Sequence, residues 1–379
     1  MGQDYQLSIQ RSFADLEDPR VVGRTSHHLL DIVVIAICGV LCGADSWVAI
    51  EQFGKAKEAW LREFLELPNG IPTHDTFGRV FGQLDAQAFE RCFTRWVQAV
   101  FTVTRGQVIA IDGKTVRRSH DRATGQDAIH LVSAWAQANS LVLGQVKTAA
   151  DSNEITAIPE LLKLLHLKGC IVTIDAAGCQ TQIARQIVEQ GADYVLAVKG
   201  NQSHLQADLT DWFDYAQQTN FNAMSFTYAK TVHKRHGRLE TRECWVIDDP
   251  LAFDYIRNFI GWAGLKSFAM VQRTRRIGDQ TTTENAYYIS SLPSDAERIL
   301  ACSRHHWAIE NSLHWVLDVT FAEDRARNRQ QNSAQNFALL RRIALNLLKQ
   351  DATLKASVNV KRLRAALDDQ YRLQLLTQV

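Results

Sequence analysis

The chain of 379 residues lacks the apolar segments that mark membrane proteins. The apolar run at residues 29–43 contains Asp31 and is shorter than the roughly 20 residues that a membrane-spanning helix needs. No basic start followed by an apolar run and a cleavage site is present, so we expect no signal peptide. The sequence therefore predicts a cytoplasmic protein without a membrane partner.

Paired cysteine spacing is also missing. The seven cysteines are an odd number and are scattered through apolar sequence. Cys38 and Cys42 lie one helical turn apart in such a run, which favours core packing over a metal site. This usage is typical of reduced thiols in the cytosol rather than of a disulfide framework.

Several catalytic motifs are absent. Without a Walker-type phosphate loop or a G-x-S-x-G motif, nothing supports nucleotide hydrolysis, a nucleotide cofactor or serine-esterase chemistry. His306, Glu310 and His314 are spaced by four, which suggests zinc, but no H-E-x-x-H or paired-cysteine motif accompanies them, and we discount that interpretation. The net charge of +1 means that a nucleic-acid hypothesis must depend on local basic clusters.

What is present is an ordinary globular composition, 46% hydrophobic and 22% charged, in a chain long enough for about two or three domains. Apolar residues from Phe77 to Leu84 recur with helical spacing behind the capping candidates Thr73 and Asp75, and a second stripe covers residues 89–101. Two short helices could form a DNA-reading helix-turn-helix. Since residues 73–84 are not strongly basic, a helical hairpin that packs on its own domain is favoured.

Two apolar runs in the middle of the chain end in an acid. Residues 108–111 lead into Asp112, and residues 170–174 lead into Asp175. Such β-branched runs are typical of strands buried on both faces, and small residues such as Gly113 predict turns after them. Both acids would stand at the carboxyl ends of central strands, where α/β sheets place ligands. The plainer alternative is an aspartate that caps a turn.

The segments around these runs predict a mixed α/β pattern with at least two parallel strands. A hairpin is expected from residues 130–138 and 141–147. Helices are expected at 155–165 and 181–189, and a third buried strand at 194–198. Residues 202–290 predict a strand-rich segment with two basic clusters. A solvated strand face explains either cluster alone, but the two together favour an inserted module that contacts phosphate.

The strongest helix pattern begins with Ser294 and Glu297, which form an S-x-x-E capping box. An apolar stripe follows over residues 299–316. Glu310 lies at the edge of this stripe, where a carboxylate is costly unless something pairs with it. A further helix is predicted at residues 337–347.

Three acids are therefore each predicted to lie beside an apolar core, namely Asp112, Asp175 and Glu310. Hard divalent ions prefer oxygen ligands and keep several waters, so converging carboxylates favour a catalytic Mg²⁺ site. Two such ions about 3.5–4 Å apart can activate a water and stabilise the leaving oxygen of a phosphoryl transfer. The basic residues that flank the two aspartates and suit phosphate binding are Lys114, Arg117, Arg118 and Lys199.

Several motifs resemble those of one enzyme family. They are IDGK at 111–114, TIDA at 173–176, VKGN at 198–201, HGRLETR at 236–242 and, above all, RHHWAIENSLHW at 304–315. Over nearly its whole length the sequence resembles the H-repeat-associated, ISAs-type transposases of bacterial insertion sequences. The last motif is highly specific to this family, whereas IDGK alone would be a weak signal.

The resemblance implies an α/β fold: an RNase H-like mixed sheet flanked by helices, with an N-terminal helical domain and a β-rich insertion before the last catalytic helix. It also implies a DDE triad of Asp112, Asp175 and Glu310 that holds metal, either Mg²⁺ or Mn²⁺, with two ions expected. The implied activity is metal-dependent DNA strand cleavage and strand transfer at the element's ends. Relatives in the broader superfamily carry a Tyr, an Arg and a Lys at fixed offsets around the glutamate. At the arginine offset this chain has His306, and at the lysine offset it has Leu317.

The implied partner is double-stranded DNA, as terminal repeats and as target, bound by a homodimer that would associate with the nucleoid. The residues expected to contact DNA are Lys114, Arg117, Arg118, Lys199, Asn201, Lys234, Arg235, Arg238, Arg304, His306 and Asn311. Two alternatives stay open. One is a transposase-derived DNA-binding protein without activity, and the other is a nuclease on the same fold.

The predicted domain order follows from these assignments. It consists of an N-terminal helical domain expected to bind DNA (1–104), the first part of the catalytic core (105–201), the β-rich insertion (202–290), the last part of the core (291–350) and a C-terminal tail (351–379).

Overall fold

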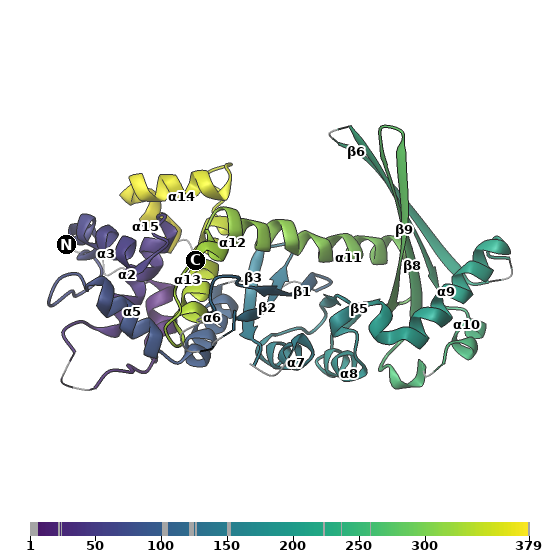
Figure 1. Ribbon diagram of the computed structural model, residues 1–379, viewed down its shortest axis with the longest axis horizontal. Coiled ribbons are helices and arrows are strands. Elements are labelled where there is room, and N and C mark those ends of the chain that lie inside the picture. The colour runs from purple at the N-terminus through teal and green to yellow at the C-terminus, as the bar shows by residue number, and fades with distance from the viewer. Residues whose placement is uncertain are drawn as a thin grey trace. The chain divides into compact units, whose positions relative to one another are not determined.

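The computed structural model describes residues 7–21, 23, 25–100, 105–120, 125, 127–149, 153–222, 224–235, 237–257 and 259–377. These residues form two compact units, each assembled from separate stretches of the chain. Unit 1 contains the described residues of 1–103, 113–151 and 310–379, and unit 2 those of 104–112 and 152–309. Figure 1 shows the chain and labels its helices and strands where there is room.

Unit 1 is mainly helical. Its helices are α1 (Ser8–Phe13), α2 (Leu29–Leu41), α3 (Trp47–Ala56), α4 (Glu58–Leu61), α5 (His74–Gln83), α6 (Ala86–Val100), α12 (Trp315–Val319), α13 (Ser333–Gln350), α14 (Val358–Leu367) and α15 (Asp369–Thr377). Helices α2 and α13 pack against each other, and almost every residue of both is buried. Apolar residues surround nearly the whole of α2, whereas the buried residues of α13 include Arg341, Arg342 and Asn346. The two helices form the centre of this unit.

The two helices predicted near residues 73–101 are α5 and α6. The Thr73 hydroxyl accepts a hydrogen bond from the Thr76 backbone, as expected of an N-cap. Both helices pack on α13, and α6 also packs on α1 and β3. The helical hairpin is thus part of the core of unit 1.

Unit 1 also contains an antiparallel hairpin, β2 (His130–Ala136) with β3 (Leu141–Lys147), as predicted. In this unit the strand order is β3-β2-β1, where β1 is the strand Val108–Thr115. The first five residues of β1 belong to unit 2, and the last three belong to unit 1.

Unit 2 is built on a mixed sheet with the order β1-β4-β5-β9-β8-β7-β6. The strands beyond β1 are β4 (Ile171–Ile174), β5 (Asp193–Val198), β6 (Phe226–Arg235), β7 (Arg238–Ile247), β8 (Ser267–Ile277) and β9 (Gln280–Ser290). Strands β1, β4 and β5 are parallel neighbours, and β9 joins β5 antiparallel. Two long hairpins, β6 with β7 and β8 with β9, complete the sheet.

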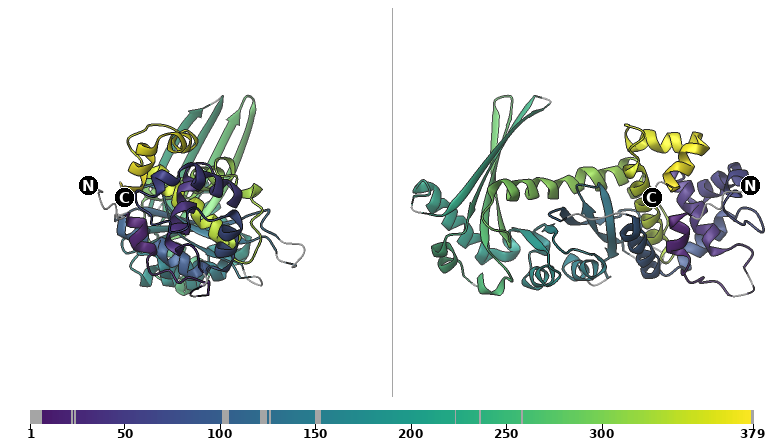
Figure 2. Two further views of the ribbon diagram at one scale, coloured as in Figure 1. Left: turned by 90° about the vertical axis from the view of Figure 1, so that its left-hand side faces the viewer. Right: turned by 180° about the vertical axis from the view of Figure 1, so that it is seen from behind.

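Helices cover both faces of this sheet. Helix α11 (Ala296–Ile309) packs along one face, whereas α7 (Glu154–Leu164) and α8 (Thr181–Glu189) lie on the other (Figures 1 and 2). Helices α9 (Ser203–Gln218) and α10 (Pro250–Tyr255) accompany the hairpins. The predicted mixed α/β fold, an RNase H-like sheet flanked by helices, is therefore confirmed.

Two local predictions were wrong. Strand β1 continues through Gly113 to Thr115, because its pairing in unit 1 keeps the backbone extended. Helix α11 begins without the predicted capping box: the Asp295 carboxylate accepts from the Arg298 backbone, while the Ser294 hydroxyl donates to the Val246 carbonyl.

Two segments contain more helix than the sequence suggested. Residues 202–290 begin with the 16-residue helix α9 before their strands start. Residues 351–379 include helices α14 and α15, which pack on each other and on α13.

The sequence predicts neither a disulfide framework nor a membrane-spanning helix. All seven cysteines lie within the described residues, and all are free thiols. In the same part of the chain, no helix is both long and apolar enough to cross a membrane.

Candidate active site

Asp112 and Asp175 lie on neighbouring parallel strands of unit 2. The last register pair between β1 and β4 is Ile111 with Ile174, so Asp112 is the next residue of β1 and Asp175 directly follows the end of β4. Side chains alternate between sheet faces, which gives Asp112 the same face as Val108 and Asp175 the same face as Ile171. Val108 and Ile171 belong to the core beneath α11. Both carboxylates therefore leave the sheet on its α11 side.

The turn after β4 fixes the position of Asp175. Its carboxylate accepts a hydrogen bond of 3.0 Å from the Ala177 backbone, so the residue does cap this turn, as the plainer interpretation expected. A Cβ on Gly178 would collide with Ile174 Cγ2, so the tight turn requires glycine there. The Asn201 side chain donates to the Ala176 carbonyl at 2.6 Å. Asn201 thus supports the turn from the loop after β5.

His306 of α11 interacts electrostatically with both aspartates and takes part in a hydrogen bond with the Thr173 backbone. Burial lowers the pKa of His306, although Asp112 and Asp175 act in the opposite direction. Burial also raises the pKa of Asp175, and the negative charges of Glu154 and Asp112 raise it further. Unit 2 therefore holds half-buried carboxylates that repel one another and are only partly compensated by a histidine.

Such a carboxylate pair fits a hard divalent cation. Oxygen donors at the edge of a sheet are the ligands that Mg²⁺ and Mn²⁺ prefer, and a cation would relieve the repulsion that raises the pKa of Asp175. The residues of unit 2 that could hold it are Asp112 and Asp175.

Glu310 and His314 belong to unit 1. Helix α11 ends at Ile309, and a π-helical turn, Glu310–His314, follows directly in the chain. Glu310, predicted to lie at the edge of the apolar stripe, is exposed, whereas His314 is buried. A carboxylate oxygen of Glu310 and a ring nitrogen of His314 lie within 4.8 Å of each other. Single π-helical turns occur frequently at functional sites.

Sequence reasoning did not select His314. Its spacing of four from Glu310 alone indicates at most a weak zinc pattern. Leu317, at the position where the broader superfamily has lysine, is fully buried and packs in the core.

The residues of unit 2 predicted to contact DNA differ in their surroundings. Lys199, Lys234, Arg238 and Arg304 are exposed. The side chain of Arg235 lies outside the described residues, as does His236 of the family motif.

The corresponding residues of unit 1 include one buried cation. The Lys114 ammonium lies 2.7 Å from Asp318, 3.1 Å from Asp324 and 3.5 Å from Glu323, and its side chain is 9% exposed. Protein carboxylates thus already surround the group that was predicted to bind phosphate. Arg117 is largely exposed and pairs with Asp324 at 3.3 Å. The exposed residues Arg118 and Asn311 complete this set.

Comparison with known proteins gives a consistent family. The family described as Transposase DDE domain matches residues 104–347, and the family described as DDE_Tnp_1-associated matches residues 10–97. The protein named "Putative transposase YncI" of Escherichia coli O157:H7 is 42% identical over 364 residues, which cover 95% of this chain and 92% of that protein.

A second relative and one solved structure complete the comparison. "H repeat-associated putative transposase YhhI" of Escherichia coli K12 is 40% identical over 366 residues, 95% of each chain. A solved piggyBac transposase synaptic complex with hairpin DNA covers 98% of this chain and 78% of that one, with a TM-score of 0.46 and 10% identity.

Proposed function

Since the chain belongs to the DDE transposases of the H-repeat-associated group, we propose that it cleaves DNA strands at the ends of an insertion sequence and transfers them to target DNA. The observation that carries this proposal is the pair Asp112 and Asp175 on adjacent parallel strands, with His306 facing both from α11. Acids on neighbouring strands can share a cation, and DNA cleavage by this class of chemistry requires one.

The proposed metal ligands are Asp112, Asp175 and Glu310. Two observations support the third: Glu310 follows His306 by four residues in the same run of helix, and it is exposed. A divalent cation, with two ions expected, would lower the pKa of the attacking water and stabilise charge on the phosphate. The ionised carboxylates contribute the negative charge that retains such ions.

The proposed reaction has two steps. Water attacks the phosphorus at the element's end, the bond from phosphorus to the 3′-oxygen breaks, and that oxygen leaves as a hydroxyl after gaining a proton. The freed 3′-hydroxyl then attacks a phosphodiester of the target and displaces another 3′-oxygen. His306, which interacts electrostatically with Asp112 and Asp175, would keep the two carboxylates oriented, and exposed Lys199 would bind a nearby phosphate.

The proposed partner is double-stranded DNA. Support comes from the exposed basic residues of β6, β7 and α11, namely Lys234, Arg238 and Arg304. Joining two element ends to one target would use two copies of the chain, so we expect a homodimer on DNA.

The test is cleavage and joining of a labelled duplex that carries one end of the element. Wild-type protein should give a nicked end and a joined product in Mg²⁺ or Mn²⁺, and neither product in EDTA. Cleavage without joining would favour the nuclease. Binding to the terminal repeat without cleavage at any metal concentration would favour the inactive DNA-binding protein and contradict the proposal.

A further inference from the structure

The α11-facing side of strand β7 changes from apolar to charged along its length. Cys244 and Val246 belong to the core beneath α11. Because side chains alternate along a strand, Arg242, Glu240 and Arg238 continue the same face. This end of β7 therefore presents charged rather than apolar side chains on that face.

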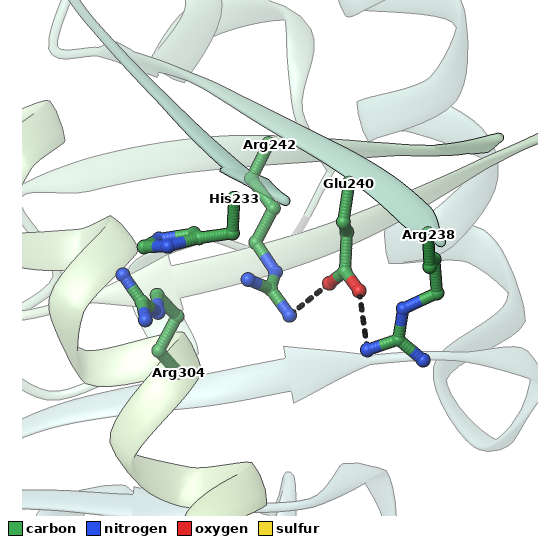
Figure 3. Close-up of a pocket in the computed structure, with 5 residues that line it drawn as sticks. All are labelled: His233, Arg238, Glu240, Arg242 and Arg304. Atoms are coloured by element: carbon green, nitrogen blue, oxygen red, sulfur yellow. Dashed lines mark ion pairs between the residues drawn. The ribbon is translucent and has the colours of Figure 1, made fainter. Parts of the chain in front are cut away.

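These residues line a pocket of about 290 Å³ together with His233 and Arg304 (Figure 3). His233 on β6 is the direct cross-strand partner of Glu240. Arg304 reaches the pocket from α11, so three elements of unit 2 contribute to it. We call these five residues the guanidinium pocket.

Glu240 orients two of the three arginines in the guanidinium pocket. Its side chain is only 4% exposed, and its two oxygens pair with different guanidinium groups. Arg238 lies 3.1 Å from one oxygen, and Arg242 pairs with the other, as the dashed lines in Figure 3 show. One carboxylate thus fixes two guanidinium groups, but its single negative charge cannot neutralise all three arginines of the pocket.

Arg304 supplies the excess positive charge. Within the described part of the chain no carboxylate pairs with its guanidinium, which lies beside His233 in Figure 3. Burial lowers the pKa of Arg242, and the positive charges of Arg304, Arg273 and Arg238 lower it further against the effect of Glu240. An anion in the pocket would relieve this repulsion.

We propose that the guanidinium pocket binds one phosphate of the DNA backbone. Guanidinium groups match phosphate oxygens with paired, charge-assisted hydrogen bonds, and the pocket is open enough for a phosphate that remains part of a strand. The proposal rests on the proposed function, since it assumes that DNA is the substrate. Arg304 and Arg242 are the groups that bind the phosphate directly, and Glu240 positions Arg242 and Arg238.

The position of Arg304 explains what such a contact would do. It precedes His306 by two residues on α11, and His306 interacts with Asp112 and Asp175. A phosphate bound at Arg304 would therefore fix the DNA to the helix that also faces the acids. The guanidinium pocket acts as a positioning site for the strand rather than as part of the reaction.

The experiment measures DNA affinity in EDTA, where no cleavage can occur, over a series of KCl concentrations. Labelled element-end duplex is titrated with wild-type protein, Arg304→Gln, Arg304→Lys and the control Arg185→Gln, which changes an exposed arginine of α8 on the other sheet face. Arg304→Gln should weaken binding roughly tenfold and reduce the slope of log K against log salt by about 0.9, the effect of one lost phosphate contact.

The other variants separate charge from geometry. Arg304→Lys keeps the charge but loses the fork of donors, so it should retain the slope and recover part of the affinity. Arg185→Gln should match wild type in both quantities. Thermal melting of each variant checks folding, and Arg304, exposed in the structure, should tolerate the change.

Wild-type affinity and slope in Arg304→Gln would overturn the proposal. So would stabilisation by inorganic phosphate that depends on Arg304 while DNA binding does not, because the pocket would then take a free anion. If wild-type protein binds no DNA at all, the proposed function fails instead, which is a different result.

Discussion

Glu90 on α6 is a buried acid that the proposed chemistry does not use. Only 4% of the residue is exposed, and one of its oxygens accepts a hydrogen bond of 2.9 Å from the Gln145 backbone. Burial raises the pKa of Glu90 to about 8, against the opposing effects of Gln145 and Arg342. The folded protein therefore keeps a proton at neutral pH that the unfolded chain, with an ordinary pKa near 4.5, releases.

This difference predicts a pH dependence of stability. Between pH 4.5 and about 8 the folded state binds more protons than the unfolded state, so the free energy of unfolding should fall as the pH rises. The slope contributed by Glu90 approaches roughly 1.4 kcal/mol per pH unit. Urea unfolding at pH 5 and pH 8 should show a smaller loss for Glu90→Gln than for wild type. The exposed control Glu63→Gln should behave like wild type, and equal losses in all three proteins would contradict the assignment.

Glu323 is the centre of a buried ion cluster in unit 1. Arg342 pairs with it at 2.8 Å with both side chains fully buried, and Lys114 lies 3.5 Å away. Burial alone would raise the pKa of Glu323, but Arg342, Arg341 and Lys114 together hold it at about 2. Sequence could not reveal this cluster, because Lys114 and its acid partners are separated by about two hundred residues.

Removing the charge of Glu323 should be costly, since it leaves buried cations without a partner. We expect Glu323→Gln to lower the free energy of unfolding by about 3–5 kcal/mol in urea titrations at pH 7. The control Glu160→Gln breaks an exposed pair with Lys163 on α7 and should have little effect. A loss for Glu323→Gln as small as that of the control would show that the cluster contributes no stability.

At the scale of single elements, the turn between β4 and α8 is held by close packing. Besides the collision with Ile174, a Cβ on Gly178 would lie 2.9 Å from Ile158 Cδ1 of α7. Both neighbours are buried and cannot move away easily. The small residues after Asp175 therefore determine where its carboxylate lies.

The matching prediction concerns Gly178→Ala. We expect it to destabilise the protein by about 1–3 kcal/mol, the usual cost of overpacking, and to reduce end cleavage because Asp175 would shift. The control is Gly261→Ala, whose Cβ would meet only Thr181 Cγ2 at an ordinary 3.7 Å. Unfolding midpoints and cleavage rates of the two variants check this, and equal midpoints would contradict it.

Elements with a strong local pattern were predictable from sequence, whereas their ends were not. The β-branched run of β4 and the amphipathic helix α8 both appear where they were predicted. Strand β1 passes Gly113 because strand pairing overrides the local signal for a turn. The π-helical turn at Glu310 gives no sequence signal distinct from a helix, so the exposure of Glu310 could not be foreseen.

At the scale of the whole chain, the described residues form two compact units. Each unit combines stretches that are far apart in sequence, because strands pair with distant partners. The predicted parallel pairing of the two acid-bearing strands is confirmed in unit 2. The assignment of Glu310 to the same site remains a proposal, supported by the family and by its position directly after α11.

The most direct test of the central claim, that Asp112, Asp175 and Glu310 act as one metal site, is end cleavage by isosteric variants. Labelled element ends in Mg²⁺ are incubated with Asp112→Asn, Asp175→Asn and Glu310→Gln, beside the exposed controls Asp211→Asn on α9 and Glu297→Gln on α11. Each of the three variants should lose at least about a hundredfold in rate while still binding the end, and both controls should match wild type. Cleavage within a few-fold of wild type by any of the three would remove that residue from the site.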